Sequence, residues 1–216
     1  MPPSPPNLTL IVAATPKNGI GKNGALPWPM LKKEMAYFAR VTKRVPATTS
    51  SSTSSTSNDS TSRRQNAVLM GRKTYLSIPP KFRPLKDRTN IVISSQPRSA
   101  LPEIADDVIV SSSIMSALQD LEAGVKAGRV PEVGRVFVIG GARVYGDALG
   151  LECARSVLLT RLGEEFECDT FFPELGQDGG WVRRGRGELE DFVGEEVGEG
   201  GVVEEGVWYE FQLWER

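Results

Sequence analysis

The chain has 216 residues, of which 39% are hydrophobic and 25% are charged, a composition typical of a globular domain. Lys and Arg total 26 against 27 for Asp and Glu, so no basic field is available for nucleic acid or an acidic membrane surface. The absence of histidine excludes a His-based catalytic triad and a His-ligated metal site. We therefore expect no metal site, no nucleic-acid partner and no membrane partner.

The N-terminal residues 1–7, MPPSPPN, have neither the basic region nor the apolar region of a signal peptide. We expect a flexible, Pro-rich start and a cytoplasmic chain. No apolar run approaches the roughly 20 residues that span a bilayer. Cys153 and Cys168 have no metal-ligand spacing, and we expect both to be reduced.

Near-continuous apolar runs predict strands that are buried on both faces, at residues 8–14, 66–70, 89–94, 107–111, 135–140 and 156–160. Helical segments alternate with them, at residues 31–42, 72–77, 113–124 and 142–148. This order predicts an α/β fold with a central, mainly parallel twisted sheet flanked by helices. The alternating run 207–215 predicts an antiparallel C-terminal hairpin at the edge, and the acidic residues 194–206 predict its solvated loop.

A Ser/Thr tract interrupts this pattern. Residues 48–62 are all Ser or Thr except Asn58 and Asp59, so they cannot bury enough apolar area to offset the entropy of ordering. We therefore expect a disordered loop insertion at residues 47–65, within one domain that spans residues 1–216.

The helix predicted at 31–42 carries a carboxylate inside its apolar arc. On a helical wheel, Glu34 lies within an apolar arc and away from the basic face; the arc is formed by Met30, Leu31, Met35, Tyr37, Phe38 and Val41. Burial would raise the pKa of Glu34, as general acid chemistry near neutral pH requires. The carboxylate could also accept two parallel N–H bonds from a flat heterocycle stacked on Phe38. The alternative is a surface glutamate that reaches past the apolar stripe to solvent.

Two strand-to-helix turns have features of an anion site. In MGRKTY, Gly71 allows a tight turn and residues 72–74 open a helix with two cations and a hydroxyl. In VFVIGGARVYGDAL, Gly140 and Gly141 would let a backbone approach a pyrophosphate. The second motif is not a full dinucleotide fingerprint, and both could be plain turns. Arg88, before a buried strand, could hold a carboxylate bidentately or be a solvated strand-start residue.

Six motifs occur together in the order of one enzyme family: GIGKNGALPWP, EMAYF, MGRKTY, SIPPKFRPLKDR, VIGGARVYGDAL and FECDTFFPE. By these motifs the chain resembles dihydrofolate reductase of the eukaryotic type, from Leu8 to the C-terminus. The resemblance implies an NADPH-dependent oxidoreductase that reduces 7,8-dihydrofolate to 5,6,7,8-tetrahydrofolate, by hydride transfer to C6 and protonation at N5. It also implies a role in one-carbon metabolism and in thymidylate and purine synthesis, inhibition by antifolates, and a cytoplasmic monomer.

The resemblance also implies residue roles. Glu34 matches the acid that binds the pterin 2-amino group and N3 and supports protonation of N5. Trp28 matches the residue that helps hold the water involved, and Thr160 matches a partner of the acid. Arg88 matches the clamp on the substrate α-carboxylate, and the other substrate positions are Ile11, Val12, Met35, Phe38, Ile78, Leu85, Ile139 and Tyr145. The cofactor positions are Ala13, Ile20, Gly21, Gly24, Arg72, Lys73, Thr74, Ser94, Gly140, Gly141, Ala142, Arg143, Val144 and Thr170, with Asp169 in the same motif and a cis Gly140–Gly141 peptide.

The chain departs from the family pattern at three positions. Ser95 and Ser112 stand where the family often has basic residues beside the 2′-phosphate of NADPH. Arg72 remains, with Arg98 as a candidate substitute, and we expect NADPH to be preferred over NADH. Met35 replaces a commonly aromatic residue, which should reshape the antifolate pocket without removing catalysis. The alternatives are an NADPH-dependent reductase of a riboflavin-pathway pyrimidine and a non-catalytic folate- or RNA-binding protein.

Overall fold

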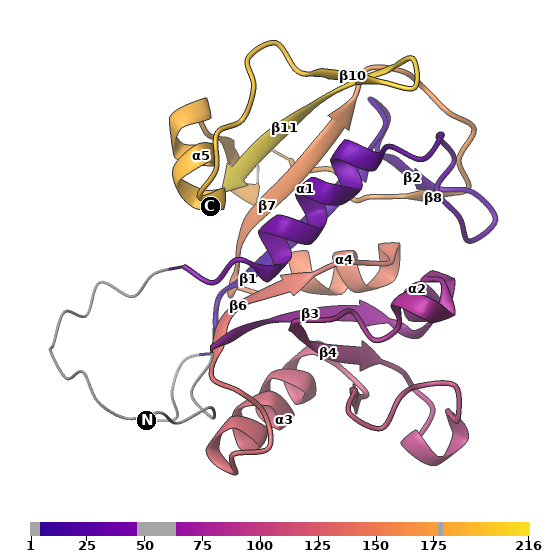
Figure 1. The fold of residues 1–216 in the computed structure, drawn as a ribbon, viewed down its shortest axis with the longest axis vertical. Helices are drawn as coiled ribbons and strands as arrows, with labels where there is room; N and C mark the ends of the chain where they lie inside the picture. Colours follow the sequence, from indigo (N-terminus) through magenta and orange to yellow (C-terminus); the bar gives the residue numbers. More distant parts are fainter. Residues whose placement is uncertain (1–4, 47–63, 177–178) are drawn as a thin grey trace, which may run out of the picture.

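The computed structural model describes residues 5–46, 64–176 and 179–216 (Figure 1). Within them, one large sheet has the strand order β10-β11-β7-β1-β6-β3-β4-β5, with β9 paired to β11, and a small sheet pairs β2 with β8. The strands are β1 (Leu8–Ala14), β2 (Gly19–Gly21), β3 (Gln65–Gly71), β4 (Arg88–Ile93), β5 (Ile109–Ser111), β6 (Val133–Val138), β7 (Ala154–Leu162), β8 (Thr170–Phe171), β9 (Val182–Arg183), β10 (Val202–Glu204) and β11 (Val207–Glu215). The α-helices are α1 (Lys32–Lys43), α2 (Arg72–Ser77), α3 (Ile114–Lys126), α4 (Ala142–Leu149) and α5 (Arg186–Val193).

The central strands run parallel. β1 pairs in parallel with β6 and β7, β3 with β6 and β4, and β4 with β5. β11 is antiparallel to β7 and to β10. β10 and β11 form the C-terminal hairpin, which lies at this edge of the sheet. The predicted α/β fold, with its mainly parallel sheet and antiparallel C-terminal hairpin, is confirmed.

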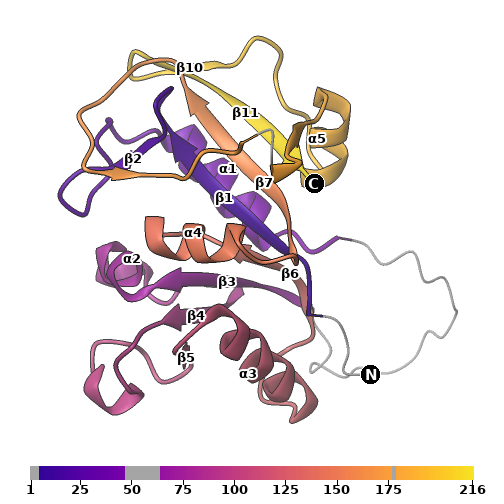
Figure 2. The same ribbon diagram turned by 180° about the vertical axis from the view of Figure 1, so that it is seen from behind.

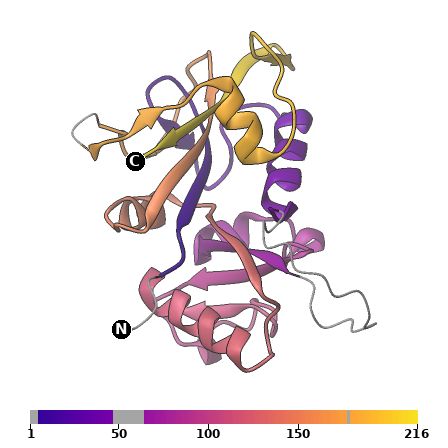
Figure 3. The same ribbon diagram turned by 90° about the vertical axis from the view of Figure 1, so that its left-hand side faces the viewer.

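Two hydrophobic clusters cover the two faces of the sheet, because successive side chains of a strand point to opposite faces. On β1, Leu8, Leu10 and Val12 pack in the cluster of α3 and α4, whereas Ile11 packs in the cluster of α1, α2 and α5. Figure 2 shows α3 and α4 in front of the sheet, and in Figure 3 α1 and α4 lie on opposite sides of the strands. Burial on both faces explains why these strands are apolar without alternation.

The structure differs from the sequence prediction at several segments. β5 begins at Ile109, two residues later than predicted, α3 extends to Lys126, and the helix α5 and the short strands β2, β8 and β9 were not predicted. The acidic segment 194–206 is not wholly solvated, since Val197 is buried and Glu195 pairs with Arg40. That part of the prediction is wrong.

Some expectations concern residues whose structure is not described. The flexible N-terminus falls outside the described residues for positions 1–4, and the disordered insertion for positions 47–63. In the ranges that are described, no helix has the length and apolar character needed to cross a membrane.

Candidate active site

The candidate site lies at the carboxyl ends of the parallel strands β1, β3 and β6. After β1 the chain continues to α1 on one face of the sheet, whereas after β6 it enters α4 on the other face. β1 and β6 are neighbours, so the connections diverge between them (Figures 1 and 2). Open α/β sheets bind ligands in the crevice that such a divergence creates.

Glu34 is buried at the start of α1. Its side chain is 8% exposed, and Thr160 on β7 donates a hydrogen bond to Glu34 Oε1 at 3.1 Å. The pKa of Glu34 is raised to about 7. Burial is the largest cause and raises the pKa, the Thr160 hydrogen bond lowers it, and the negative charge of Glu204 raises it. A carboxyl with this pKa is partly protonated at neutral pH and can take part in proton transfer there.

Exposed apolar side chains lie close to Glu34 in the sequence. Met30 is 73% exposed and Met35 is 46% exposed, although the helical wheel placed both in the apolar arc. Phe38 is half-buried and packs against the same cluster as Ile78, Leu85 and Ile139. Phe38 of α1 therefore shares one face with the residues that follow α2 and β6. Exposed apolar surface beside a buried acid suits a flat heterocycle.

Trp28 and Tyr145 approach this region from other elements. Trp28 is buried with Leu31 and Tyr209, next to the start of α1. Tyr145 of α4 donates a hydrogen bond from its hydroxyl to the Ile11 carbonyl oxygen at 2.7 Å. Val12 and Tyr145 belong to the hydrophobic cluster on the α4 face, so these two predicted substrate residues do not pack with Phe38.

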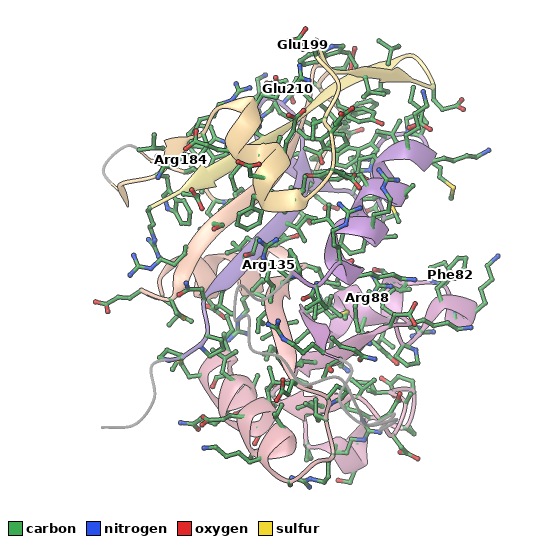
Figure 4. All side chains as sticks on the ribbon, turned by 60° about the vertical axis from the view of Figure 1, so that its left-hand side comes forward. Phe82, Arg88, Arg135, Arg184, Glu199 and Glu210 are labelled. Carbon is green, nitrogen blue, oxygen red and sulfur yellow. The ribbon has the colours of Figure 1, made fainter. Side chains whose placement is uncertain are left out.

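Arg88 lies under the C-terminal part of α1 (Figure 4). Its guanidinium donates to Thr42 Oγ1 at 2.8 Å through one terminal nitrogen, and to the Lys86 carbonyl at 3.0 Å through Nε. Thr42 in turn donates to the Phe38 carbonyl at 2.7 Å. No sequence motif pointed to Thr42, which holds the guanidinium against α1. An arginine guanidinium held in one orientation is suited to binding a carboxylate through two hydrogen bonds.

A cradle of glycines joins β3, β6 and the helices that follow them. The Gly71 N–H donates to the Gly140 carbonyl at 2.7 Å, and the expected cis Gly140–Gly141 peptide is present. A Cβ on Gly141 would lie 3.2 Å from Thr74 Oγ1, and one on Gly71 would lie 3.2 Å from Val144 Cγ2.

A side chain at Gly71 or Gly141 would require its neighbour to shift by a few tenths of an ångström. Both residues are the N-caps of helices, α2 and α4, and neither helix has a side-chain cap for its first N–H groups. The open amides of two converging helix starts fit the pyrophosphate of a dinucleotide such as NADPH.

The small sheet brings together the predicted residues beside the nicotinamide. Gly21 of β2 pairs with Thr170 of β8. Asp169 accepts hydrogen bonds from the Asn23 N–H at 2.7 Å and from the Thr170 hydroxyl at 2.7 Å. The Asn23 hydrogen bond is the main cause that lowers the pKa of Asp169. Residues 19–24 are therefore held against residues 169–171.

Arg72 and Arg98, the two arginines predicted near the 2′-phosphate, have different hydrogen-bond partners. Arg72 donates to Gln96 Oε1 at 2.8 Å, and the Gln96 N–H donates to Ser94 Oγ at 3.0 Å. Arg98 instead donates to the carbonyl oxygens of residues 104, 105 and 108 and to Asp106. The expectation that Arg98 substitutes at the 2′-phosphate is not supported, because its guanidinium is hydrogen-bonded to residues of the segment 104–108.

Comparisons with known proteins decide the family. The sequence model described as dihydrofolate reductase matches residues 58–190. The chain belongs to the dihydrofolate reductase family. It is 37% identical over 214 residues to the dihydrofolate reductase of Pneumocystis carinii, with 97% of each chain covered, and 39% identical over 220 residues to that of Candida albicans, with 99% of each covered.

Two further dihydrofolate reductases extend the comparison. The one from Schizosaccharomyces pombe is 39% identical over 222 residues, which are 97% of this chain but 47% of that relative, so this chain spans about half its length. The solved structure of Schistosoma mansoni dihydrofolate reductase superposes with a TM-score of 0.73 at 32% identity, covering 98% of this chain and 99% of that chain. The matches confirm the predicted family, fold class and dihydrofolate reductase activity, and favour neither alternative function.

Proposed function

We propose that this chain reduces 7,8-dihydrofolate with NADPH and that Glu34 is the acid of the reaction. The observation that carries the proposal is a buried carboxyl with a pKa of about 7 beside exposed apolar side chains. In its charged form Glu34 accepts hydrogen bonds from the 2-amino group and N3 of the pterin. In its protonated form it supports delivery of a proton to N5, with Trp28 helping to hold the intervening water.

The substrate tail would follow α1 toward its C-terminal end. Phe38, Ile78 and Leu85 form the apolar wall for the aminobenzoyl ring. Arg88, held by Thr42, would receive the α-carboxylate through its remaining N–H groups. Met35 contributes a flexible side chain where an aromatic ring is common in the family, so the pocket for antifolates has a different shape.

NADPH would lie along the glycine cradle, and when bound it supplies the hydride that reaches C6. Gly71, Gly140 and Gly141 let the backbone approach the pyrophosphate, and Thr74 offers its hydroxyl there. Arg72 supplies the charge for the 2′-phosphate, which supports NADPH over NADH although Ser95 and Ser112 are neutral.

We also propose that the enzyme works as a cytoplasmic monomer. Cys153 and Cys168 are both free, which supports a reducing compartment. The near-zero net charge supports a small-molecule substrate rather than a nucleic-acid partner.

The test is NADPH oxidation followed by absorbance with dihydrofolate, with methotrexate as inhibitor. We expect rapid oxidation that methotrexate blocks, slower oxidation of NADH, and loss of the NADPH preference in Arg72→Gln. Lys81→Gln, which removes an exposed charge outside the MGRKTY motif, is the control. NADPH oxidation with a riboflavin-pathway pyrimidine but not with dihydrofolate would overturn the proposal. A folded chain that oxidises NADPH with neither substrate would also overturn it.

A further inference from the structure

The acidic C-terminal hairpin reaches the start of the helix that carries Glu34. The N-cap of α1 is Leu31, which has no side chain able to accept a hydrogen bond from the first turn. Glu204, the last residue of β10, supplies that acceptor: the Lys33 N–H lies 3.0 Å from each of its carboxylate oxygens. Figure 1 shows the β10–β11 hairpin close to this end of α1.

A second contact fixes the Glu204 carboxylate. The hydroxyl of Tyr209, on β11 of the same hairpin, donates to Glu204 Oε2 at 3.1 Å. Tyr209 is fully buried and packs with Trp28 and Leu31 at the start of α1. These two contacts hold the Glu204 carboxylate in one position, bonded to the backbone N–H of Lys33, the residue that precedes Glu34.

This position has an electrostatic consequence for Glu34. A helix N-terminus carries positive potential, which favours a charged carboxylate in the first turn. A carboxylate bound to the Lys33 N–H of that turn offsets part of this potential and repels a second negative charge nearby. The geometry points to Glu204 as a positioning residue that favours the protonated form of Glu34, an inference that rests on the proposed role of Glu34 as the acid.

Other groups around Glu34 do not duplicate this effect. Among the residues that the structure describes, the titratable groups that interact with Glu34 are Glu204, Tyr37, Tyr145 and Tyr209, and Thr160 adds a hydroxyl. Burial raises the pKa of all three tyrosines, so they stay neutral across the range in which Glu34 titrates. Glu204 is thus the negative charge among these groups that raises the pKa of Glu34.

Glu204→Gln removes the charge and keeps an oxygen that can accept from Lys33. Glu205→Gln is the matched control, because Glu205 is the next residue but is exposed at the turn. Glu204→Asp keeps the charge on a shorter side chain. The first readout is the side-chain carboxyl titration of Glu34 in the ¹³C-labelled full chain, assigned by its loss in Glu34→Gln. It needs neither substrate nor cofactor.

We expect Glu204→Gln to lower the pKa of Glu34 by about half a unit, and Glu204→Asp to lower it less. Glu205→Gln should leave it unchanged. Hydride transfer to dihydrofolate at a pH above the pKa should then slow by about threefold in Glu204→Gln, and should match the wild-type rate at low pH.

Two outcomes separate the inference from the proposed function. An unchanged Glu34 titration in Glu204→Gln, or an equal shift in Glu205→Gln, would overturn the role of Glu204. A wild-type chain that does not reduce dihydrofolate would overturn the proposed function, whereas the carboxyl titration would still test the coupling of Glu204 to Glu34.

Discussion

Thr160 Oγ1 donates a hydrogen bond to Glu34 Oε1 at 3.1 Å, and both side chains are almost completely buried. The bond joins β7 to α1 and opposes the effect of burial on Glu34. A hydrogen bond to the charged form of a carboxyl lowers its pKa, whereas desolvation raises it. The value of about 7 is the balance of these effects.

Thr160→Val should shift that balance upward. Valine has a similar shape but no hydroxyl, so the pKa of Glu34 should rise by up to about one unit. The pH at which hydride transfer begins to slow should rise with it, opposite to the shift expected for Glu204→Gln. Stopped-flow rates across pH measure this change, with Thr9→Val on β1 as a control for a buried Thr-to-Val exchange. A downward shift would contradict the assigned effect of the hydrogen bond.

Glu34→Gln should stabilise the fold at alkaline pH. The folded-state pKa of Glu34 is raised from the ordinary value of 4.5 to about 7. Below 4.5 the carboxyl is protonated in both folded and unfolded states, so its raised pKa costs nothing. Between 4.5 and 7 the unfolded state increasingly loses the proton first, and above 7 the folded state carries the full cost of about 3 kcal/mol.

Urea unfolding of wild type and Glu34→Gln at several pH values measures this cost. The free energy of unfolding of the variant should exceed that of the wild type by up to about 3 kcal/mol at pH ~8 and should be similar near pH ~4.5. Glu205→Gln, which removes an exposed charge, should show no such pH dependence. A variant less stable than wild type at alkaline pH would contradict the prediction that the buried, charged form of Glu34 destabilises the fold.

Arg88→Leu should weaken binding of substrates that carry the glutamate tail. Loss of a charge-assisted hydrogen bond costs about 1.5–3 kcal/mol, so KM for dihydrofolate should rise by roughly 10- to 100-fold with little change in kcat. KM for a dihydropterin that lacks the aminobenzoylglutamate tail should not change. Lys86→Gln removes an exposed charge two residues away and is the control. Equal losses for both substrates would remove Arg88 from the carboxylate clamp.

The sequence predicted the parts of the site that depend on local patterns. The helix expected at 31–42 is α1 at Lys32–Lys43, and the strand expected at 66–70 is β3 at Gln65–Gly71. The strand expected at 135–140 is β6, which begins and ends two residues earlier, at Val133–Val138. The carboxylate within the apolar arc of α1 is indeed buried, because a helical wheel captures which residues share a face. Met30 and Met35 share that arc but are exposed, since the wheel cannot show where the sheet ends beneath the helix.

Contacts between distant segments could not be predicted in this way. Glu204 lies 171 residues from Lys33, and its acidic neighbours gave it the pattern of a solvated loop. The helix α5 was missed because it is short and rich in charge, although Glu188 accepts from the Gly185 N–H and Gly194 has a left-handed φ of 69° at its end. These are the local signals that could have revealed it.

The most direct test of Glu34 as the acid is the pH dependence of hydride transfer in wild type and Glu34→Gln. If Glu34 is the acid, the wild-type rate should fall as pH rises through about 7, and the variant should bind NADPH normally but react slowly and without that pH dependence. A Glu34→Gln enzyme with near-wild-type turnover at neutral pH, or with the same pH profile, would contradict it.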